Sequence, residues 1–197
     1  MGKNWQHLVD TAPTRTYQRK ATVKGRLLVR YVPYKAFAGH SPISYLYASG
    51  NLNRCNPAGI PCIYFGEGST TARAEFDSYH KSPLTELGYY ARASLRAIID
   101  LADESTRKHF GVTKSDFTCP YVTKSGELIK LQHIGRAVAA QNRVSAIRFP
   151  SNAMLDKGQT GFNLVVFQDL LAAPDFLEIL DDNQILERWP RQHRSKN

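Results

Sequence analysis

Arg54, Tyr64 and Glu75 lie within one short stretch of the chain, and their side chains together suit one kind of chemistry. An arginine offers a pyrophosphate two parallel hydrogen bonds, and an aromatic ring packs well on a cationic pyridinium. A carboxylate that is held in place stabilises a developing positive charge. Cleavage of the nicotinamide–ribose bond of NAD places such a charge on the ribose, as glycoside cleavage does. Nicotinamide leaves as a neutral base, so these residues suit an NAD-cleaving site without a strong general acid.

The elements that must position these side chains follow one another directly. Turn-forming residues at 50–61 place Arg54 in an irregular loop, and the apolar run 62–65 predicts a buried strand. Ser69 is the expected N-cap of the helix that follows. Three residues share one stripe of that helix at spacings of four and three: Ala72, Phe76 and Tyr79. Glu75 lies about 40° from Tyr79 on a helical wheel, so we expect its carboxylate near the inward face.

Three motifs in this stretch carry a family resemblance: RCNPAGIP at 54–61, IY at 63–64 and TARAE at 71–75. They resemble the core signature of RES-domain proteins, the toxin halves of bacterial RES–Xre toxin–antitoxin pairs. The family is named for an arginine, a glutamate and a serine, which Arg30, Glu75 and Ser151 match here. The segment GFNLVVF at 161–167 resembles the family's closing strand, and the likeness covers roughly residues 22 to 180. One departure is Cys55, which stands where the family usually has an aromatic residue.

The resemblance implies a fold, a substrate, a partner and a set of site residues. The fold is a compact α+β domain similar to that of ADP-ribosyltransferases, and the substrate is NAD. The partner is an Xre-type antitoxin with a DNA-binding part, which covers the active site, so nucleic acid is contacted only through it. The residues expected to act in catalysis are Arg30, Glu75 and Ser151. The residues expected to bind NAD are Arg54, Tyr31, Tyr64 and Asn163.

Several of these residues also fit plain structural roles. Arg30 lies in an apolar stretch where an edge-strand arginine pointing to solvent is an alternative. Ser151 follows a predicted strand and also fits an ordinary turn. It lacks the GxSxG context of a nucleophilic serine. Tyr64 lies in an apolar strand, where a tyrosine is also typical of the core.

Composition limits the class of protein. The chain has 197 residues and a formal net charge of +9, and it fits one domain with short appendages. Three cysteines without a CxxC pair give neither a disulfide framework nor a zinc site, which favours a reducing cytoplasm. We expect no metal and no membrane partner, because metal-ligand spacings and long apolar runs are absent from the sequence. The basic residues are dispersed, which favours a small anionic ligand over a nucleic-acid stripe.

Along the chain we expect an N-terminal arm or short helix at 1–21, a catalytic domain at 22–182 and a basic tail at 183–197. Residues 34–58 form a long connection and residues 112–126 a polar loop. For 89–102 a helix is the alternative to a strand. The predicted strands are 23–32, 62–65, 89–102, 144–149, 162–167 and 176–180. Besides the helix that starts at Ser69, the predicted helices are 103–110 and 127–141, the latter amphipathic.

The sequence therefore predicts a toxin that breaks down NAD by hydrolysis or phosphorolysis. Transfer of ADP-ribose to a protein acceptor is the first alternative, and the acceptor itself cannot be identified from the residues. A basic module that acts on nucleic acid is the second alternative. A non-catalytic binding domain that retains the pocket is the third.

Overall fold

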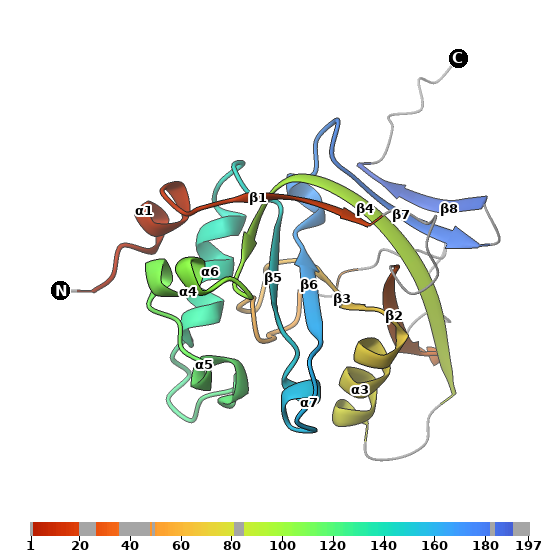
Figure 1. Cartoon of the computed structure of the whole chain (residues 1–197), viewed down its shortest axis with the longest axis horizontal. Coiled ribbons are helices and arrows are strands. Elements are labelled where there is room, and N and C mark those ends of the chain that lie inside the picture. The colour runs from red at the N-terminus through yellow and green to blue at the C-terminus, as the bar shows by residue number, and fades with distance from the viewer. Residues whose placement is uncertain are drawn as a thin grey trace.

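One long strand, β4, arches through the molecule, and the other strands are arranged along it (Figure 1). The computed structural model describes residues 2–19, 27–35, 48, 50–80, 85–181 and 184–190. The described strands are β1 (Arg15–Arg19), β2 (Leu28–Pro33), β3 (Ile63–Glu67), β4 (Glu86–Asp100), β5 (Ala146–Pro150), β6 (Phe162–Val166), β7 (Phe176–Asp181) and β8 (Gln184–Trp189). The described helices are α1 (Trp5–Asp10), α3 (Ser69–Tyr79), α4 (Glu104–Phe110), α5 (Ser115–Thr118), α6 (Lys130–Ala139) and α7 (Asn152–Leu155), with a short 3-10 helix, η1 (Gln168–Leu170).

The strand pairing closes on itself. The first half of β4 pairs with β2 and β7, and its second half pairs with β1 and, in parallel, with β5. From β5 the order runs through β6 and β3 to β2, which returns to β4. Strand β8 extends the sheet beyond β7. The circuit of β2, β3, β6, β5 and β4 encloses a buried apolar cluster, which includes Leu28, Phe65, Leu95, Leu164 and Ile179.

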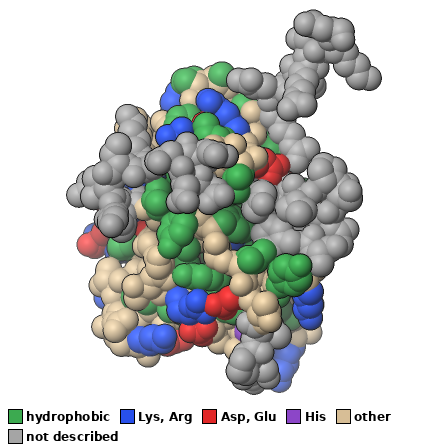
Figure 2. Space-filling view, turned by 90° about the vertical axis from the view of Figure 1, so that its right-hand side faces the viewer, with side chains coloured by type: hydrophobic (Ala, Val, Ile, Leu, Met, Phe, Trp, Pro, Cys, Tyr) green, Lys and Arg blue, Asp and Glu red, His purple; other side chains and the backbone are tan. Residues whose placement is uncertain are grey.

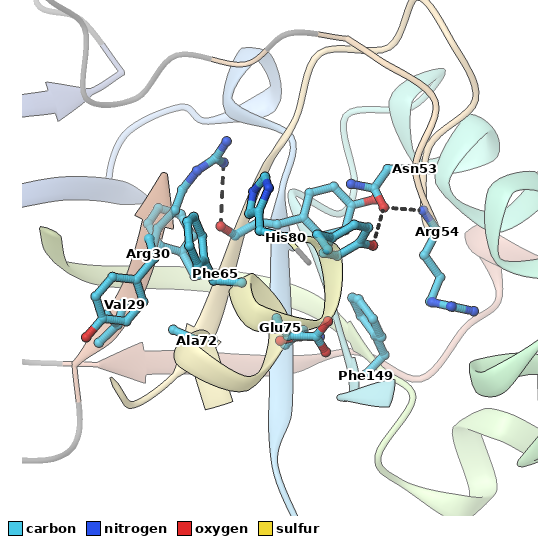
Figure 3. A pocket seen from close by; sticks show the side chains of 15 residues that line it. Val29, Arg30, Asn53, Arg54, Phe65, Ala72, Glu75, His80 and Phe149 are labelled. Atoms are coloured by element: carbon cyan, nitrogen blue, oxygen red, sulfur yellow. Dashed lines mark hydrogen bonds between the residues drawn. The ribbon is translucent and has the colours of Figure 1, made fainter. Parts of the chain in front are cut away.

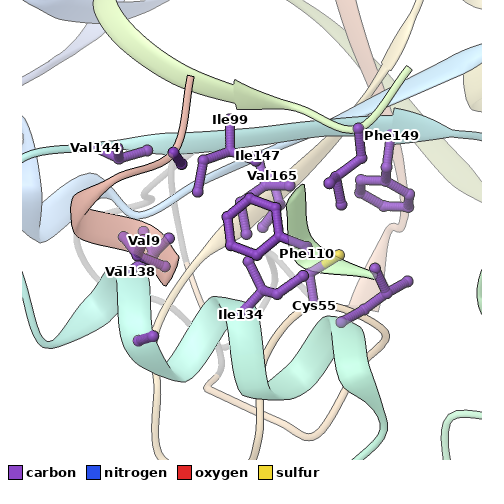
Figure 4. Close-up of a cluster of buried hydrophobic side chains, with 14 of the residues drawn as sticks. Val9, Cys55, Ile99, Phe110, Ile134, Val138, Val144, Ile147, Phe149 and Val165 are labelled. Atoms are coloured by element: carbon purple, nitrogen blue, oxygen red, sulfur yellow. The ribbon is translucent and has the colours of Figure 1, made fainter. Parts of the chain in front are cut away.

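A second apolar cluster lies between the other face of the sheet and the helices α1, α4, α5 and α6 (Figures 1 and 4). Helix α6 contributes the apolar stripe predicted for it: Leu131, Ile134 and Val138 are all at most 1% exposed. Phe110 fits between this stripe and the strand residues Ile147 and Val165 (Figure 4). Helices α3 and α7 pack on each other near β2, β3 and β6.

Most of the predicted elements are confirmed, and so is the α+β class. The segment 89–102 is a strand as far as Asp100 and not a helix: β4 spans Glu86–Asp100, and Tyr89, Ala91, Ala93 and Leu95 alternate along it as buried positions. The predicted helix at 103–110 begins after an Asp103 N-cap, whose Oδ2 accepts the Thr106 backbone N–H at 2.8 Å. It ends at Gly111, which has a φ of 63°.

Other expectations differ from the structure. The N-cap of α3 is Gly68, with a φ of 95°, and Ser69 is its first residue, because the turn out of β3 requires a left-handed position. Tyr79 is 50% exposed rather than inward, since it belongs to the last turn of α3. The polar loop 112–126 contains α5, whose Phe117 is buried.

The two ends of the chain contain strands that the sequence did not suggest. The segment 1–21, expected as an arm or short helix, contains α1 but also β1, which pairs with β4. Strand β8 lies in the segment expected as a basic tail. It was not predicted, because its apolar residues Ile185 and Leu186 are adjacent and exposed and give no alternating pattern. The predicted strand 23–32 is described from residue 27 onward. Residues 36–47 and 49 of the connection 34–58 lie outside the described residues.

A buried ion-pair network joins four strands on the enclosed side of the sheet. Arg148 on β5 donates to Glu67 on β3 at 2.7 Å and to Asp100 on β4 at 3.1 Å. On β1, Arg15 pairs with Asp100 at 2.6 Å and Arg19 pairs with Glu67 at 2.5 Å. Because Arg148, Glu67 and Asp100 are largely desolvated and satisfy one another, removing one of these three should leave an uncompensated charge inside the protein.

The network makes stability depend on pH in a definite direction. Burial alone would raise the pKa of Glu67, but the hydrogen bonds and charges of Arg148 and Arg19 outweigh it and lower that pKa. The stabilisation is therefore complete above the ordinary glutamate pKa and is lost as pH falls through the folded-state value. We expect the free energy of unfolding, measured by urea titration from pH 7 to pH 3, to fall with acidification, and Glu67→Gln to flatten that slope.

Glu104→Gln is the matched control for this prediction. Glu104 is exposed and pairs with Lys108 within α4, where solvent screens the interaction. The slope in this variant should follow that of the wild type. Equal slopes for Glu67→Gln and the wild type would assign the acid sensitivity to other groups.

In the described part of the chain, no helix is long and apolar enough to cross a membrane. Within the same residues there is also no group of three or more acidic, histidine or cysteine side chains suited to hold a metal ion.

Candidate active site

A cavity opens between β2, β3, α3 and the loop that carries Arg54 (Figure 3). Six of the seven predicted site residues line it: Arg30, Tyr31, Arg54, Tyr64, Glu75 and Asn163. The folding of distant segments against one another therefore brings these predicted residues together.

Glu75 is held by two neutral donors on the same oxygen. Its Oε1 accepts the Ser151 hydroxyl at 2.5 Å and the Asn163 side-chain amide at 2.7 Å. Its Oε2 has no hydrogen-bond partner among the described residues, and no described arginine or lysine forms an ion pair with it. The two donors thus orient the carboxylate through Oε1, and Oε2 remains available to a ligand in the cavity.

The position of Glu75 follows from the close packing of α3 on β3. A Cβ atom at Gly66 would lie 2.4 Å from the backbone nitrogen of Ala72, so only glycine allows this approach. Thr71, Ala72 and Ala74 are small and buried, and they let the helix lie against the strands. Glu75 follows directly on the same helix, so its side chain reaches Asn163 at the start of β6.

Arg54 is a buried cation that forms no ion pair with the described acidic residues. The residue is 9% exposed, and its Nη1 donates to the backbone oxygen of Cys119 at 2.9 Å. The guanidinium carbon lies 5.6 Å from the centre of the Tyr121 ring. No carboxylate in the described part of the chain pairs with it. Because a buried charge is costly unless it is paired, this arrangement favours an anionic ligand.

Arg30 supplies a second cation on another side of the cavity. It lies on β2, and among the described residues its guanidinium makes one long hydrogen bond of 3.5 Å, from Nη1 to the backbone oxygen of Tyr64. It too forms no ion pair with a described carboxylate. The guanidinium is half-buried and lines the cavity, so the solvent-facing alternative for this arginine is not what the structure has. In Figure 3, Arg30 and Arg54 lie on either side of Glu75.

The two predicted tyrosines differ in how much of each remains for a ligand. The Tyr64 hydroxyl donates to Asn56 Oδ1 at 2.8 Å and accepts the Cys55 N–H at 2.9 Å. Burial raises the pKa of Tyr64 well above its usual value, so this hydroxyl stays neutral and holds the Arg54 loop. Only the Tyr64 ring is left to contact a ligand. Tyr31 lines the cavity with its ring beside the Arg73 guanidinium, whose carbon lies 4.2 Å from the ring centre.

Ser151 lies behind the cavity rather than in its lining. It is fully buried, and its Oγ accepts the Met154 N–H at 3.2 Å as the N-cap of α7. The same hydroxyl donates to Glu75. The alternative structural role of Ser151, at a turn, is therefore present in the structure. The serine also orients the Glu75 carboxylate. Ser151 therefore contacts Glu75 from behind and does not itself line the cavity.

Comparison with known proteins identifies the family of this chain. The family model described as the RES domain matches residues 27–188, a range that contains all of the predicted site residues. The chain belongs to the RES-domain family. Comparison with curated proteins gives no match.

This RES domain also has a similar solved structure, the crystal structure of the M. tuberculosis MbcT–MbcA toxin–antitoxin complex. The TM-score is 0.64 at 14% sequence identity, and the match covers 95% of this chain and 91% of the other. At that identity the likeness shows the fold. The predictions of a RES domain and of a single α+β domain are therefore confirmed.

Three polar residues that line the cavity of this RES domain were not among the predicted site residues: Asn53, Tyr79 and His80. Asn53 Oδ1 accepts the Arg54 backbone N–H at 2.8 Å and the Tyr79 hydroxyl at 3.3 Å, which ties α3 to the loop. The His80 ring packs on Phe76 at 4.4 Å between ring centres. Asparagine before the signature arginine was a usable signal, because Asn side chains commonly bond to the backbone of their own loop.

Proposed function

We propose that this RES-domain protein cleaves the nicotinamide–ribose bond of NAD and acts as the toxin of a toxin–antitoxin pair. The observation that carries the proposal is that one cavity is lined by both a carboxylate and two guanidinium groups, none of which forms an ion pair with the described residues. Glu75 presents a free carboxylate oxygen there, and Arg30 and Arg54 present guanidinium groups that no described carboxylate neutralises. A dinucleotide with an anionic pyrophosphate and a ribose that becomes cationic matches both charges.

Each side chain has a role that its environment supports. Glu75 Oε2 accepts a hydrogen bond from a ribose hydroxyl and stabilises the positive charge that builds as nicotinamide leaves. Ser151 and Asn163 hold Oε1, so the carboxylate does not need to reorient during the reaction. Arg54 and Arg30 bind the pyrophosphate, and the rings of Tyr31 and Tyr64 pack against the nicotinamide end.

The product depends on the nucleophile that reaches the ribose carbon. We rank water or phosphate first, because no feature of the described cavity recognises a protein acceptor. Incubation of the purified protein with NAD, followed by chromatography of free nicotinamide with and without phosphate, tests the cleavage itself. Labelled NAD added to a cell lysate separates breakdown from transfer. Label on one protein band with little loss of bulk NAD would make the protein an ADP-ribosyltransferase.

The charge distribution supports a small anionic ligand rather than a nucleic acid. On the face shown in Figure 2, the described Lys and Arg side chains are scattered among acidic and apolar ones, without a continuous basic band. The cations of the cavity, Arg54 in particular, are inside the protein, where a duplex does not reach them. Release of nicotinamide that is unaffected by added DNA or RNA would agree with this assignment.

Membership of the RES family and the likeness to a toxin–antitoxin complex support a cognate antitoxin. We propose an Xre-type protein that covers the mouth of the cavity and blocks NAD. Expression of the chain alone should stop growth, and co-expression of the cognate antitoxin should restore it. A purified pair that releases nicotinamide as fast as the free chain would contradict occlusion of the site.

A further inference from the structure

Gln132 on α6 is buried, and every hydrogen-bonding group of its side-chain amide contacts the backbone. The residue is 1% exposed and lies outside the lining of the cavity. Its Nε2 donates to the backbone oxygens of Asn53 and Tyr121, both at 2.9 Å. Its Oε1 accepts the backbone N–H of Ile129 at 3.0 Å, at the start of the helix. Both donor hydrogens are thus used to join two loops that lie far apart in the sequence.

Those two loops are the walls of the Arg54 site. Asn53 precedes Arg54, so the first hydrogen bond fixes the backbone that carries the guanidinium. Tyr121 supplies the ring beside that guanidinium, and Cys119, two residues earlier, supplies the carbonyl that accepts from it. Gln132 therefore sets the distance between the arginine backbone and the groups that receive its side chain.

The helix backbone supports the same contact from one turn further on. A Cβ atom at Gly135 would lie 1.6 Å from the backbone oxygen of Cys55, so α6 touches the loop directly on the other side of Arg54. Beside this contact, Leu131 and Val138 anchor α6 in the apolar core. The loop is thus held on a rigid support at the residues before and after the arginine.

We propose that Gln132 is a positioning residue that holds Arg54 where it meets the pyrophosphate of the dinucleotide. The inference rests on the proposed function, since it needs Arg54 to bind the anionic part of NAD. Without the amide, the two loops separate and the guanidinium loses its fixed direction. Affinity for the pyrophosphate falls, whereas the groups around Glu75 stay in place. The effect belongs to binding and not to the chemical step.

The test is a double-mutant cycle with ADP-ribose as the probe. Gln132→Met keeps the side-chain volume and removes all three hydrogen bonds, and we expect about tenfold weaker binding by calorimetry. The KM for NAD should rise similarly while kcat changes less than about twofold. In an Arg54→Met background, Gln132→Met should cause no further loss, because its effect passes through Arg54. Gln141→Met, at a glutamine just beyond α6 that bonds to Gln6, is the matched control.

The outcomes separate this inference from the proposed function. Nicotinamide release by the wild type together with normal ADP-ribose affinity in Gln132→Met would overturn the inference alone. Additive losses in the double variant would also overturn it, since they would mean a general structural role. A wild type that neither releases nicotinamide nor binds ADP-ribose would overturn both proposals. Should Gln132→Met not fold, Gln132→Asn keeps a neutral amide in the interior but shortens its reach by one methylene, so that it no longer spans both loops, and it should show the same non-additive loss.

Discussion

Glu75→Gln is expected to reduce nicotinamide release at least about a hundredfold while the fold remains intact. A charge preorganised at the transition state contributes about 3 kcal/mol or more, and its loss lowers the rate accordingly. The glutamine oxygen can still accept from Ser151 and Asn163, which donate to Oε1 now. Its NH2 group then replaces Oε2 and faces the cavity as a donor. A donor neither stabilises a cationic ribose nor accepts from its hydroxyl group.

Asp77→Asn provides the control for this substitution. Asp77 is an exposed acid on the same helix, and it forms a long ion pair with Arg73 at 4.0 Å. This variant should keep wild-type turnover, growth arrest and thermal stability. Single-turnover measurements with saturating NAD would show whether Glu75→Gln affects the chemical step. A folded Glu75→Gln protein with near-normal turnover would remove Glu75 from the mechanism.

The local parts of this site could be predicted from the sequence because each rests on neighbouring residues. The strand before Gly66, the helix after it and the inward bias of Glu75 all follow from patterns within a few turns of chain. The buried alternation of β4 and the caps of α4 were predictable for the same reason. The N-cap of α3 was not, because the close approach of Ala72 to Gly66 decides where the chain turns.

The contacts that combine these parts could not be predicted, since they join distant segments. Ser151 and Glu75 are 76 positions apart, and only the folded chain shows that the serine bonds to the carboxylate rather than facing the cavity. In the sequence, Gln132 is one polar residue of a predicted amphipathic helix. In the structure it is 1% exposed and holds the loop of Arg54. Strand β8 was not predicted, because its adjacent apolar residues Ile185 and Leu186 are both exposed and do not form the alternation of a half-buried strand.

Arg54→Met should weaken binding of ADP-ribose by about 30- to 150-fold, since hydrogen bonds to a charged group contribute about 2–3 kcal/mol. Arg54→Lys should also bind clearly less well, because an ammonium group cannot reproduce a planar two-point contact. Calorimetry with ADP-ribose measures both. Arg107→Lys is the control, because Arg107 also donates to backbone carbonyls, those of Leu101 and Ala102, but does not line the cavity.

The stability of the same variants provides the second part of this test. In the free protein Arg54 is a buried cation that no described carboxylate pairs with, so desolvation of its charge opposes folding. Replacement by methionine removes that charge and leaves an apolar side chain beside Tyr121. We therefore expect the free energy of unfolding of ligand-free Arg54→Met to equal or exceed that of the wild type, although the variant no longer binds well. Arg148→Met, which breaks a satisfied network, should instead lose about 3–5 kcal/mol. A destabilised Arg54→Met protein with unchanged ADP-ribose affinity would give Arg54 a structural role in its loop, because a side chain kept for ligand binding should weaken the free protein rather than support it.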